Sequence, residues 1–235
     1  MKTFLKTGCI VCALFLLGAL FYDWFHPKIY ITASATPNKQ PITRIDTEQP
    51  TVFLTFETGG GHDNTEKILD ILDKYEVHAA FFITGSFAAE NPELVKRIAA
   101  SGHDLGNHSE THKNMKAMSP DECRREIRSL HEKVKELTGV EMYLFRPPYD
   151  ASNYSLIQNA AACGYITVGW SCDSMDWKNY GADAVAETVC GQPKLENGSV
   201  IRMNCNALYT PEALEKIILN LKERGCEFAP LSQFL

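Results

Sequence analysis

Short apolar runs alternate with amphipathic stretches along most of this chain. Residues 51–56 are rich in β-branched and aromatic side chains, which favours a strand. Residues 64–75 carry their apolar side chains at helical spacing, so that these share one face. The alternation continues and predicts further strands at 79–84, 103–107, 141–145, 165–170, 199–203 and 226–229, and further helices at 91–102, 119–139, 152–163, 182–189 and 210–225.

Capping residues support several of these helices. Asn91 is followed by Pro92 at the first helical position, and Ser119 with Glu122 forms a capping box. About seven rounds of strand and helix imply a parallel sheet, either open or closed into a barrel. The sequence therefore predicts an α/β fold.

Polar residues follow most of the predicted strands directly. Glu57 follows the first strand, His108 the third, Arg146 the fourth, Asp173 the fifth after a short exit, and Asn204 the sixth. In a βα barrel the carboxyl ends of the strands form the active-site face, so this distribution indicates a site there.

Within that set, His108 and His112 are four residues apart. A single helical turn would place both imidazoles on one face, where each can offer a nitrogen to one divalent metal. Such a site needs a third, usually anionic, ligand and an open position for water. The alternative is two unrelated histidines at this spacing, and the position of His108 after a strand favours the metal.

Composition narrows the class of protein. The net charge of −6 and the pI near 5.7 argue against a nucleic-acid binder, which normally carries a basic face. The eight cysteines are too few and too scattered for a disulfide scaffold.

The N-terminal residues predict membrane attachment. Lys2 and Lys6 precede an apolar run at 8–22, with Trp24 and Phe25 at its far edge. We interpret residues 1–25 as an uncleaved single-pass anchor, 26–49 as a tether and 50–235 as an extracytoplasmic domain. A cleaved signal peptide ending near Ala33-Ser34-Ala35 is the alternative.

From residue 50 to the C-terminal end, the chain resembles the polysaccharide deacetylases of carbohydrate esterase family four, the NodB homology domain. Five short motifs occur in the order and spacing of that family. The resemblance implies a distorted (β/α)7, TIM-like barrel. It also implies removal of acetyl groups from N-acetylated glycans, peptidoglycan or chitin-like, with a divalent metal that is commonly zinc.

The resemblance assigns roles residue by residue. His108 and His112 match the metal histidines. In the motif at 146–149, Arg146 orients the base, Pro148 lines the groove, and the backbone N–H of Tyr149 helps to hold the oxyanion. In the motif at 173–177, Asp173 tunes the catalytic acid and Trp177 packs the site on the opposite wall.

Three motif positions depart from the family pattern. The base aspartate is Glu57, which keeps a carboxylate but moves it outward, and the metal aspartate is Thr58, a neutral and poor zinc ligand. The histidine acid is Asn204, whose amide cannot donate a proton to a leaving amine near neutral pH. We therefore expect zinc to bind weakly. His62 or Asp63 could replace the missing ligand, or could simply be loop residues before the helix at 64.

Two functional hypotheses follow. The chain is either an N-deacetylase with reduced activity, or a glycan-binding domain that has lost turnover. The N-terminal anchor and the Asn204 segment also resemble the sporulation-type (PdaB-like) branch of the family, which implies a role in sporulation or cell-wall assembly.

Overall fold

The structure is a computed structural model that describes residues 39–59, 63–193 and 195–235. The predicted anchor at 1–25 and the first part of the predicted tether lie outside these residues. Among the described residues, no helix is both long and apolar enough to cross a bilayer. The division into anchor, tether and catalytic domain therefore stays a prediction.

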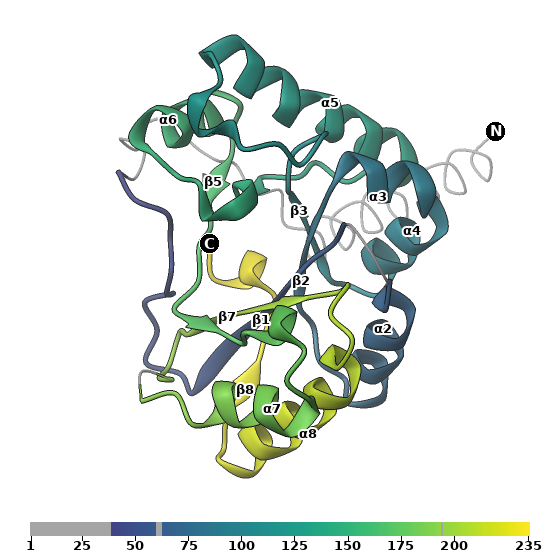
Figure 1. The fold of residues 1–235 in the computed structure, drawn as a ribbon, viewed down its shortest axis with the longest axis vertical. Helices are drawn as coiled ribbons and strands as arrows, with labels where there is room; N and C mark the ends of the chain where they lie inside the picture. Colours follow the sequence, from purple (N-terminus) through teal and green to yellow (C-terminus); the bar gives the residue numbers. More distant parts are fainter. Residues whose placement is uncertain (1–38, 60–62, 194) are drawn as a thin grey trace, which may run out of the picture. The chain divides into compact units, whose positions relative to one another are not determined.

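A curled parallel sheet is surrounded by helices (Figure 1). Its strand order is β5-β4-β3-β2-β1-β7-β6, and β8 pairs with β1 outside this path. The strands are β1 (Thr51–Glu57), β2 (Ala80–Ile83), β3 (Asp104–Asn107), β4 (Leu144–Phe145), β5 (Ile166–Thr167), β6 (Cys172–Asp173), β7 (Val200–Asn204) and β8 (Glu227–Phe228). This curled sheet is consistent with the distorted (β/α)7 barrel that the family resemblance implies.

Helices connect the strands and cover the outer face of the sheet. They are α2 (Thr65–Lys74), α3 (Gly85–Glu90), α4 (Pro92–Ala100), α5 (Pro120–Thr138), α6 (Tyr154–Ala162), α7 (Ala182–Cys190) and α8 (Thr210–Glu223). Short 3-10 turns follow several strands: η1 (Met115–Ala117), η2 (Pro148–Asp150), η3 (Asp176–Lys178) and η4 (Leu231–Gln233). The capping box at Ser119 and Glu122 forms as predicted, and α5 ends at Gly139 in the left-handed conformation.

The alternation of side chains along β1 and β7 determines which residues reach the barrel interior. In β1, Leu54 and Phe56 pack against the helices, whereas Phe53 belongs to a smaller inner cluster. Side chains alternate between the two faces of a strand, so Glu57 shares the inner face with Phe53. The same alternation in β7 points the side chains of Ile201 and Met203 toward the helices and those of Arg202 and Asn204 into the barrel.

Two elements differ from the prediction. The apolar run expected as one strand at 165–170 forms β5 only as far as Thr167, and Asp173 belongs to a separate strand, β6. The chain cannot continue from β5 into β6 as one strand, because the two lie at opposite edges of the sheet. Strand β5 pairs with β4, whereas β6 pairs with β7. Helix α3 was not predicted, because its six residues are too short to show helical periodicity.

Residues 42–45 run along the open side of the sheet, from the edge strand β5 to the start of β7. Ile42 forms a bridge with Val168 beside β5, and Arg44 forms a bridge with Ser199 beside β7. The side chain of Ile45 is 4% exposed and belongs to the inner cluster. We call residues 42–45 the closing segment. It lies within the predicted tether, and it is packed against the barrel.

Candidate active site

Glu57 lies at the centre of a charged cluster at the carboxyl end of β1. Its Oε1 is 3.1 Å from Nε of Arg202 and 3.4 Å from Nη1 of Arg146. Nη1 of Arg146 also donates to Thr55, and its Nη2 donates to the Gly169 carbonyl, so this fully buried guanidinium is held from several sides. Both arginines also lie against the Trp170 ring.

This arrangement keeps Glu57 ionised. Burial by itself raises the pKa of the carboxyl group, but His108, Arg146 and Arg202 together lower it below its usual value. Burial lowers the pKa of Arg146 to about 10, which leaves its positive charge in place near neutral pH. Glu57 is therefore a fixed carboxylate with one oxygen facing two guanidinium groups.

His108 and His112 come together without a helical turn. Ser109 and His112 have positive φ values of 68° and 52°, and the resulting loop brings the two rings to a centroid distance of 4.9 Å. The predicted proximity is confirmed, but the predicted helical geometry is wrong. Left-handed residues after β3, rather than a helix, turn the second imidazole back toward the first.

The hydrogen bonding of His108 leaves one ring nitrogen for a ligand. Its Nδ1 is 2.7 Å from the Arg146 carbonyl, an acceptor, so Nδ1 carries the proton. Its buried Nε2 has no hydrogen-bond partner among the described residues and lies 3.8 Å from Oε2 of Glu57. Burial lowers the pKa of His108 to about 4 and also lowers that of His112, so both rings are neutral at pH 7.

These neutral histidines fit a divalent metal, but the other donors fit it less well. Oγ1 of Thr58 accepts a hydrogen bond from the Thr84 N–H at 3.3 Å, and a hydroxyl is a poor zinc ligand. The described residues contain no group of three or more His, Cys, Asp or Glu side chains arranged to hold a metal ion. The orphaned Nε2 of His108 supports a metal, whereas the donor set predicts weak affinity.

The sequence offered His62 and Asp63 as replacements for the missing metal ligand. His62 lies outside the described residues. Asp63 is engaged locally, because its Oδ1 accepts hydrogen bonds from both the backbone N–H and the hydroxyl of Thr65. Asp63 therefore serves the start of α2, which is the structural role that the sequence left open for it.

Asn204 is paired with Asp176 rather than with Asp173. Nδ2 of Asn204 donates to Oδ1 of Asp176 at 2.6 Å, and its backbone N–H donates to Oδ2 at 2.7 Å. The Thr210 hydroxyl adds a third hydrogen bond to the same buried carboxyl group. The resemblance implied that Asp173 tunes the group at position 204, but in the structure Asp173 turns instead to Nη1 of Arg202 at 3.3 Å.

Exposed aromatic residues lie on two sides of this cluster. Tyr149 follows β4 and is 66% exposed, and its ring is tilted against that of His112 with the centroids 4.9 Å apart. Trp177 follows β6 and is 52% exposed. Because β4 and β6 lie on opposite sides of β1 in the sheet, the two rings flank Glu57 from opposite walls. Pro148 is buried beneath Tyr149, whose backbone adopts a left-handed conformation.

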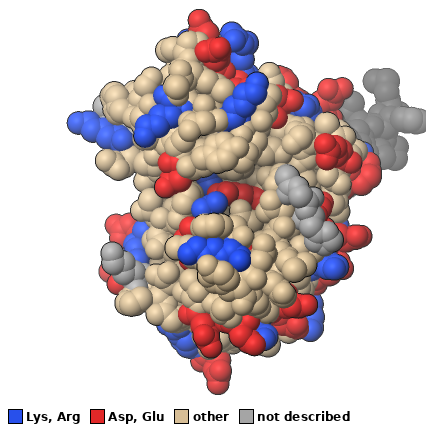
Figure 2. All heavy atoms as spheres, viewed as in Figure 1, with Lys and Arg blue, Asp and Glu red and all other residues tan. Residues whose placement is uncertain are grey.

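The molecular surface has a hollow in which acidic and basic side chains are exposed. Figure 2 shows acidic and basic atoms together in a hollow that crosses this face, between the side of α5 and α6 and the side of α7 and α8. Such a surface suits a polar, extended ligand better than an apolar one.

Two residues of this cluster were missed from the sequence. Arg202 lies two positions before Asn204, and the strand period of two would have placed both side chains inside the barrel. Asp176 lies in the motif with Asp173, but only the loop geometry decides which aspartate reaches Asn204.

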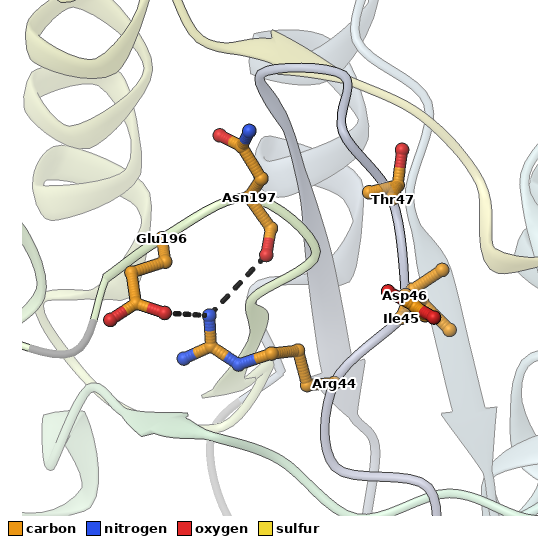
Figure 3. Close-up of a pocket in the computed structure, with 6 residues that line it drawn as sticks. All are labelled: Arg44, Ile45, Asp46, Thr47, Glu196 and Asn197. Carbon is orange, nitrogen blue, oxygen red and sulfur yellow. Dashed lines mark hydrogen bonds and ion pairs between the residues drawn. The ribbon is translucent and has the colours of Figure 1, made fainter.

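A separate cavity of about 550 Å³ lies near the start of β7, lined by Arg44, Ile45, Asp46, Thr47, Glu196 and Asn197. There Nη1 of Arg44 pairs with Glu196 at 2.8 Å and donates to the Asn197 carbonyl (Figure 3). Asn204 is at the opposite end of β7, so this cavity is separate from the candidate active site.

Comparison with known proteins gives consistent matches. Residues 44–168 match the family model described as polysaccharide deacetylase. The peptidoglycan-N-acetylglucosamine deacetylase of Bacillus cereus is 36% identical over 184 residues, which cover 77% of this chain and 66% of that protein. The peptidoglycan-N-acetylmuramic acid deacetylase PdaA of Bacillus subtilis is 30% identical over 198 residues, covering 81% and 73%.

A solved structure extends the similarity to the fold. BA3943 of Bacillus anthracis, described as a CE4 family pseudoenzyme, superposes with a TM-score of 0.78 at 30% identity, covering 84% of this chain and 69% of that one. A mutant of the same protein, described as having restored enzymatic activity, gives the same TM-score. Similar proteins thus include both active deacetylases and a pseudoenzyme.

Proposed function

Because this chain belongs to the polysaccharide deacetylase family, we propose that it slowly hydrolyses N-acetyl groups on cell-wall or chitin-like glycans. The observation that carries the proposal is the state of His108. Its Nδ1 is fixed by the Arg146 carbonyl, and its buried Nε2 faces the site beside Glu57 without a hydrogen bond. The buried Nε2 of His103 also lacks a hydrogen bond, so what distinguishes His108 is that its free nitrogen lies 3.8 Å from the carboxylate of Glu57.

The proposed mechanism assigns one step to each group. His108 and His112 hold a divalent metal, zinc in our proposal, which would lower the pKa of a bound water and polarise the amide carbonyl. Glu57 accepts the proton of the attacking water, and Arg146 and Arg202 orient its carboxylate. The backbone N–H of Tyr149 stabilises the oxyanion, and Trp177 contacts the glycan.

Protonation of the leaving amine is the weak step. The side chain at position 204 is an amide held by Asp176, and an amide does not supply a proton near neutral pH. Loss of a general acid costs about 10²–10⁴-fold in rate, so the proposed activity is low rather than absent.

Acetate release tests this proposal. The chain, purified with zinc, should release acetate from peptidoglycan fragments or chitin oligomers above the rate of the Glu57→Gln variant. Metal analysis of the same samples should find zinc in the parent and none in the His108→Ala, His112→Ala double variant. Equal acetate release by the parent and Glu57→Gln, at equal zinc content, would contradict it.

A second candidate function is glycan binding without turnover. The Asn204–Asp176 pair favours it, because two hydrogen bonds to Asp176 hold Asn204, whose amide cannot act as an acid, and a third, from Thr210, fixes Asp176 itself. In that case the parent binds glycan oligomers but gives no more acetate than Glu57→Gln. The two functions are thus separated by measuring binding and acetate release on one preparation.

We further propose that the chain is anchored in a membrane by residues 1–25, with the barrel outside the cytoplasm. The charge pattern around the apolar run supports this. Fractionation should recover the intact chain with membranes and leave the barrel accessible to external protease. A soluble mature chain that starts near Thr36 would overturn the proposal.

A further inference from the structure

A segment after β6 displays two aromatic rings and one positive charge. Trp177 and Tyr180 are 52% and 75% exposed. Nζ of Lys178 lies 5.4 Å from the centroid of the Trp177 ring and 5.8 Å from that of the Tyr180 ring. We call Trp177, Lys178 and Tyr180 the aromatic rim. Large exposed aromatic side chains grouped in this way are typical of ligand-binding surfaces.

The aromatic rim is held rigidly from below. Asp176, at the start of η3, is fully buried and accepts hydrogen bonds from Asn204 and Thr210. At the other end of η3, Oδ1 of Asn179 accepts the backbone N–H of Leu208 at 2.9 Å. Because both ends are tied to the segment after β7, the rings are presented in a fixed position. A preorganised surface loses little entropy on binding.

The rim borders the candidate active site directly. Asn204 lies level with Glu57 in the β1–β7 register, and Asp176 bonds to Asn204. Trp177 is the next residue in the chain. A glycan whose acetamide lies beside Glu57 therefore extends over the rim with its neighbouring sugar.

Lys178 carries the one charge of the rim. No carboxyl group of the described residues lies within 4.0 Å of its Nζ. The two nearby aspartates are engaged elsewhere, Asp173 with Arg202 and Asp176 with Asn204. Lys178 is thus the one exposed cation of the rim, on a chain of net charge −6. A positive charge beside exposed rings is complementary to an acidic sugar.

We propose that the aromatic rim is a binding subsite for a carboxylate-bearing sugar next to the sugar in the active site. One face of that sugar stacks on Trp177 and Tyr180, and its carboxylate pairs with Lys178. The ligand class is therefore a glycan strand whose muramic acid carries no peptide, because an attached peptide would convert that carboxyl group into a neutral amide. Neutral chitin lacks the carboxylate altogether. This inference rests on the proposed binding of N-acetylated glycans at the site and specifies which glycan is preferred.

The expected effects are modest and measurable. An exposed ion pair changes affinity by about two- to fivefold. A stacked aromatic ring is worth up to roughly tenfold. Lys178→Gln should therefore reduce affinity for the acidic glycan by about two- to fivefold and leave affinity for chitotetraose unchanged. Tyr180→Ala should weaken both ligands, because stacking does not depend on the carboxylate.

The test uses calorimetric titration of the full chain with three ligands. These are a peptide-free peptidoglycan tetrasaccharide, the same tetrasaccharide with its carboxyl groups reduced to alcohols, and chitotetraose. Lys67→Gln in α2 and Tyr154→Ala in α6 are matched controls, because both side chains are exposed on helices away from the rim. Thermal unfolding of each variant checks that folding is intact.

The proposal expects the parent to prefer the acidic tetrasaccharide over both neutral ligands, and Lys178→Gln to remove that preference. Equal affinity of the parent for all three ligands would overturn the subsite while leaving glycan binding intact. A preference that survives Lys178→Gln would also overturn it. If the parent binds none of the three, the proposed function itself fails, which is a distinguishable result.

Discussion

An acid introduced at position 204 should depend on Asp176 and not on Asp173. The parent for this experiment is Thr58→Asp, which supplies an anionic ligand next to His108 and His112. In the added Asn204→His substitution, Nδ1 of the histidine is two bonds from Cβ, as Nδ2 of the asparagine is. The Nδ1–H group can therefore take over the 2.6 Å hydrogen bond to Asp176. Nε2 is then left to protonate the leaving amine.

The structure sets the expected magnitudes. Restoring a general acid should raise acetate release by about 10²–10⁴-fold over Thr58→Asp alone. The hydrogen bond from the imidazolium to Asp176 contributes about 1.5–3 kcal/mol, so Asp176→Asn should remove roughly 10- to 150-fold of this gain. Asp173 contacts the site only through Arg202, at 3.3 Å in a partly exposed pair, so Asp173→Asn should change the rate less than about fivefold.

Acetate release from peptidoglycan fragments, measured at saturating zinc, decides between the two aspartates. Thermal unfolding accompanies every variant, because Asp176 also holds the backbone of Asn204 and the hydroxyl of Thr210. If Asp173→Asn abolishes the gain while a folded Asp176→Asn variant keeps it, the reasoning from the Asn204–Asp176 pair is refuted.

Three further predictions follow from the same structure. Thr58→Asp should lower the melting temperature without metal, because it buries a carboxylate, and zinc should raise the melting temperature more than in the parent; equal zinc shifts in differential scanning fluorimetry would contradict this. Burial, followed by the neighbouring His78, lowers the pKa of His103 to about 4, below its unfolded value of about 6.5. The unfolded chain then binds the extra proton, so His103 by itself should lower stability by at most about 3 kcal/mol as the pH drops from 6.5 to 4. Urea titrations should show a smaller total fall for His103→Phe than for the parent, in which His108 contributes as well. Gly198 has φ +79°, and an added Cβ would lie 1.7 Å from the Ile45 carbonyl oxygen, so Gly198→Ala should cost more than about 2 kcal/mol in urea unfolding, whereas Gly139→Ala, at φ +76° with open space around it, should cost about 1–2.

The sequence predicts the parallel α/β sheet, and which residues gather at its site, for a physical reason. Strand and helix periods are local, and polar residues that follow parallel strands must meet at one end of the sheet. Glu57, His108, Arg146 and Asn204 all meet there. The family resemblance adds roles to these positions, and those roles stay predictions until variants are assayed.

Contacts within loops were not predictable from the sequence. The proximity of His108 and His112 depends on two residues with positive φ, Ser109 and His112. Unlike glycine, neither residue type lets a positive φ be predicted from the sequence. The choice between Asp173 and Asp176 depends on Met175, which also has positive φ and turns the chain between them. Arg202 was overlooked because its partner Glu57 is 145 residues away in the chain, although strand alternation alone places it inside.

The closing segment also defines where this domain can be cut for expression. Backbone hydrogen bonds join Ile42 to Thr167 and Gly169, and Ile45 to Gly198. A fragment that starts at Thr51 keeps all the strands of the sheet but leaves the outer edge beside β5, and Ser199 at the start of β7, uncovered. Unpaired strand edges recruit other chains, so such a fragment should aggregate, whereas one that starts at residue 39 should remain monomeric. Fragment design on this barrel therefore begins ahead of Ile42, well before the first strand.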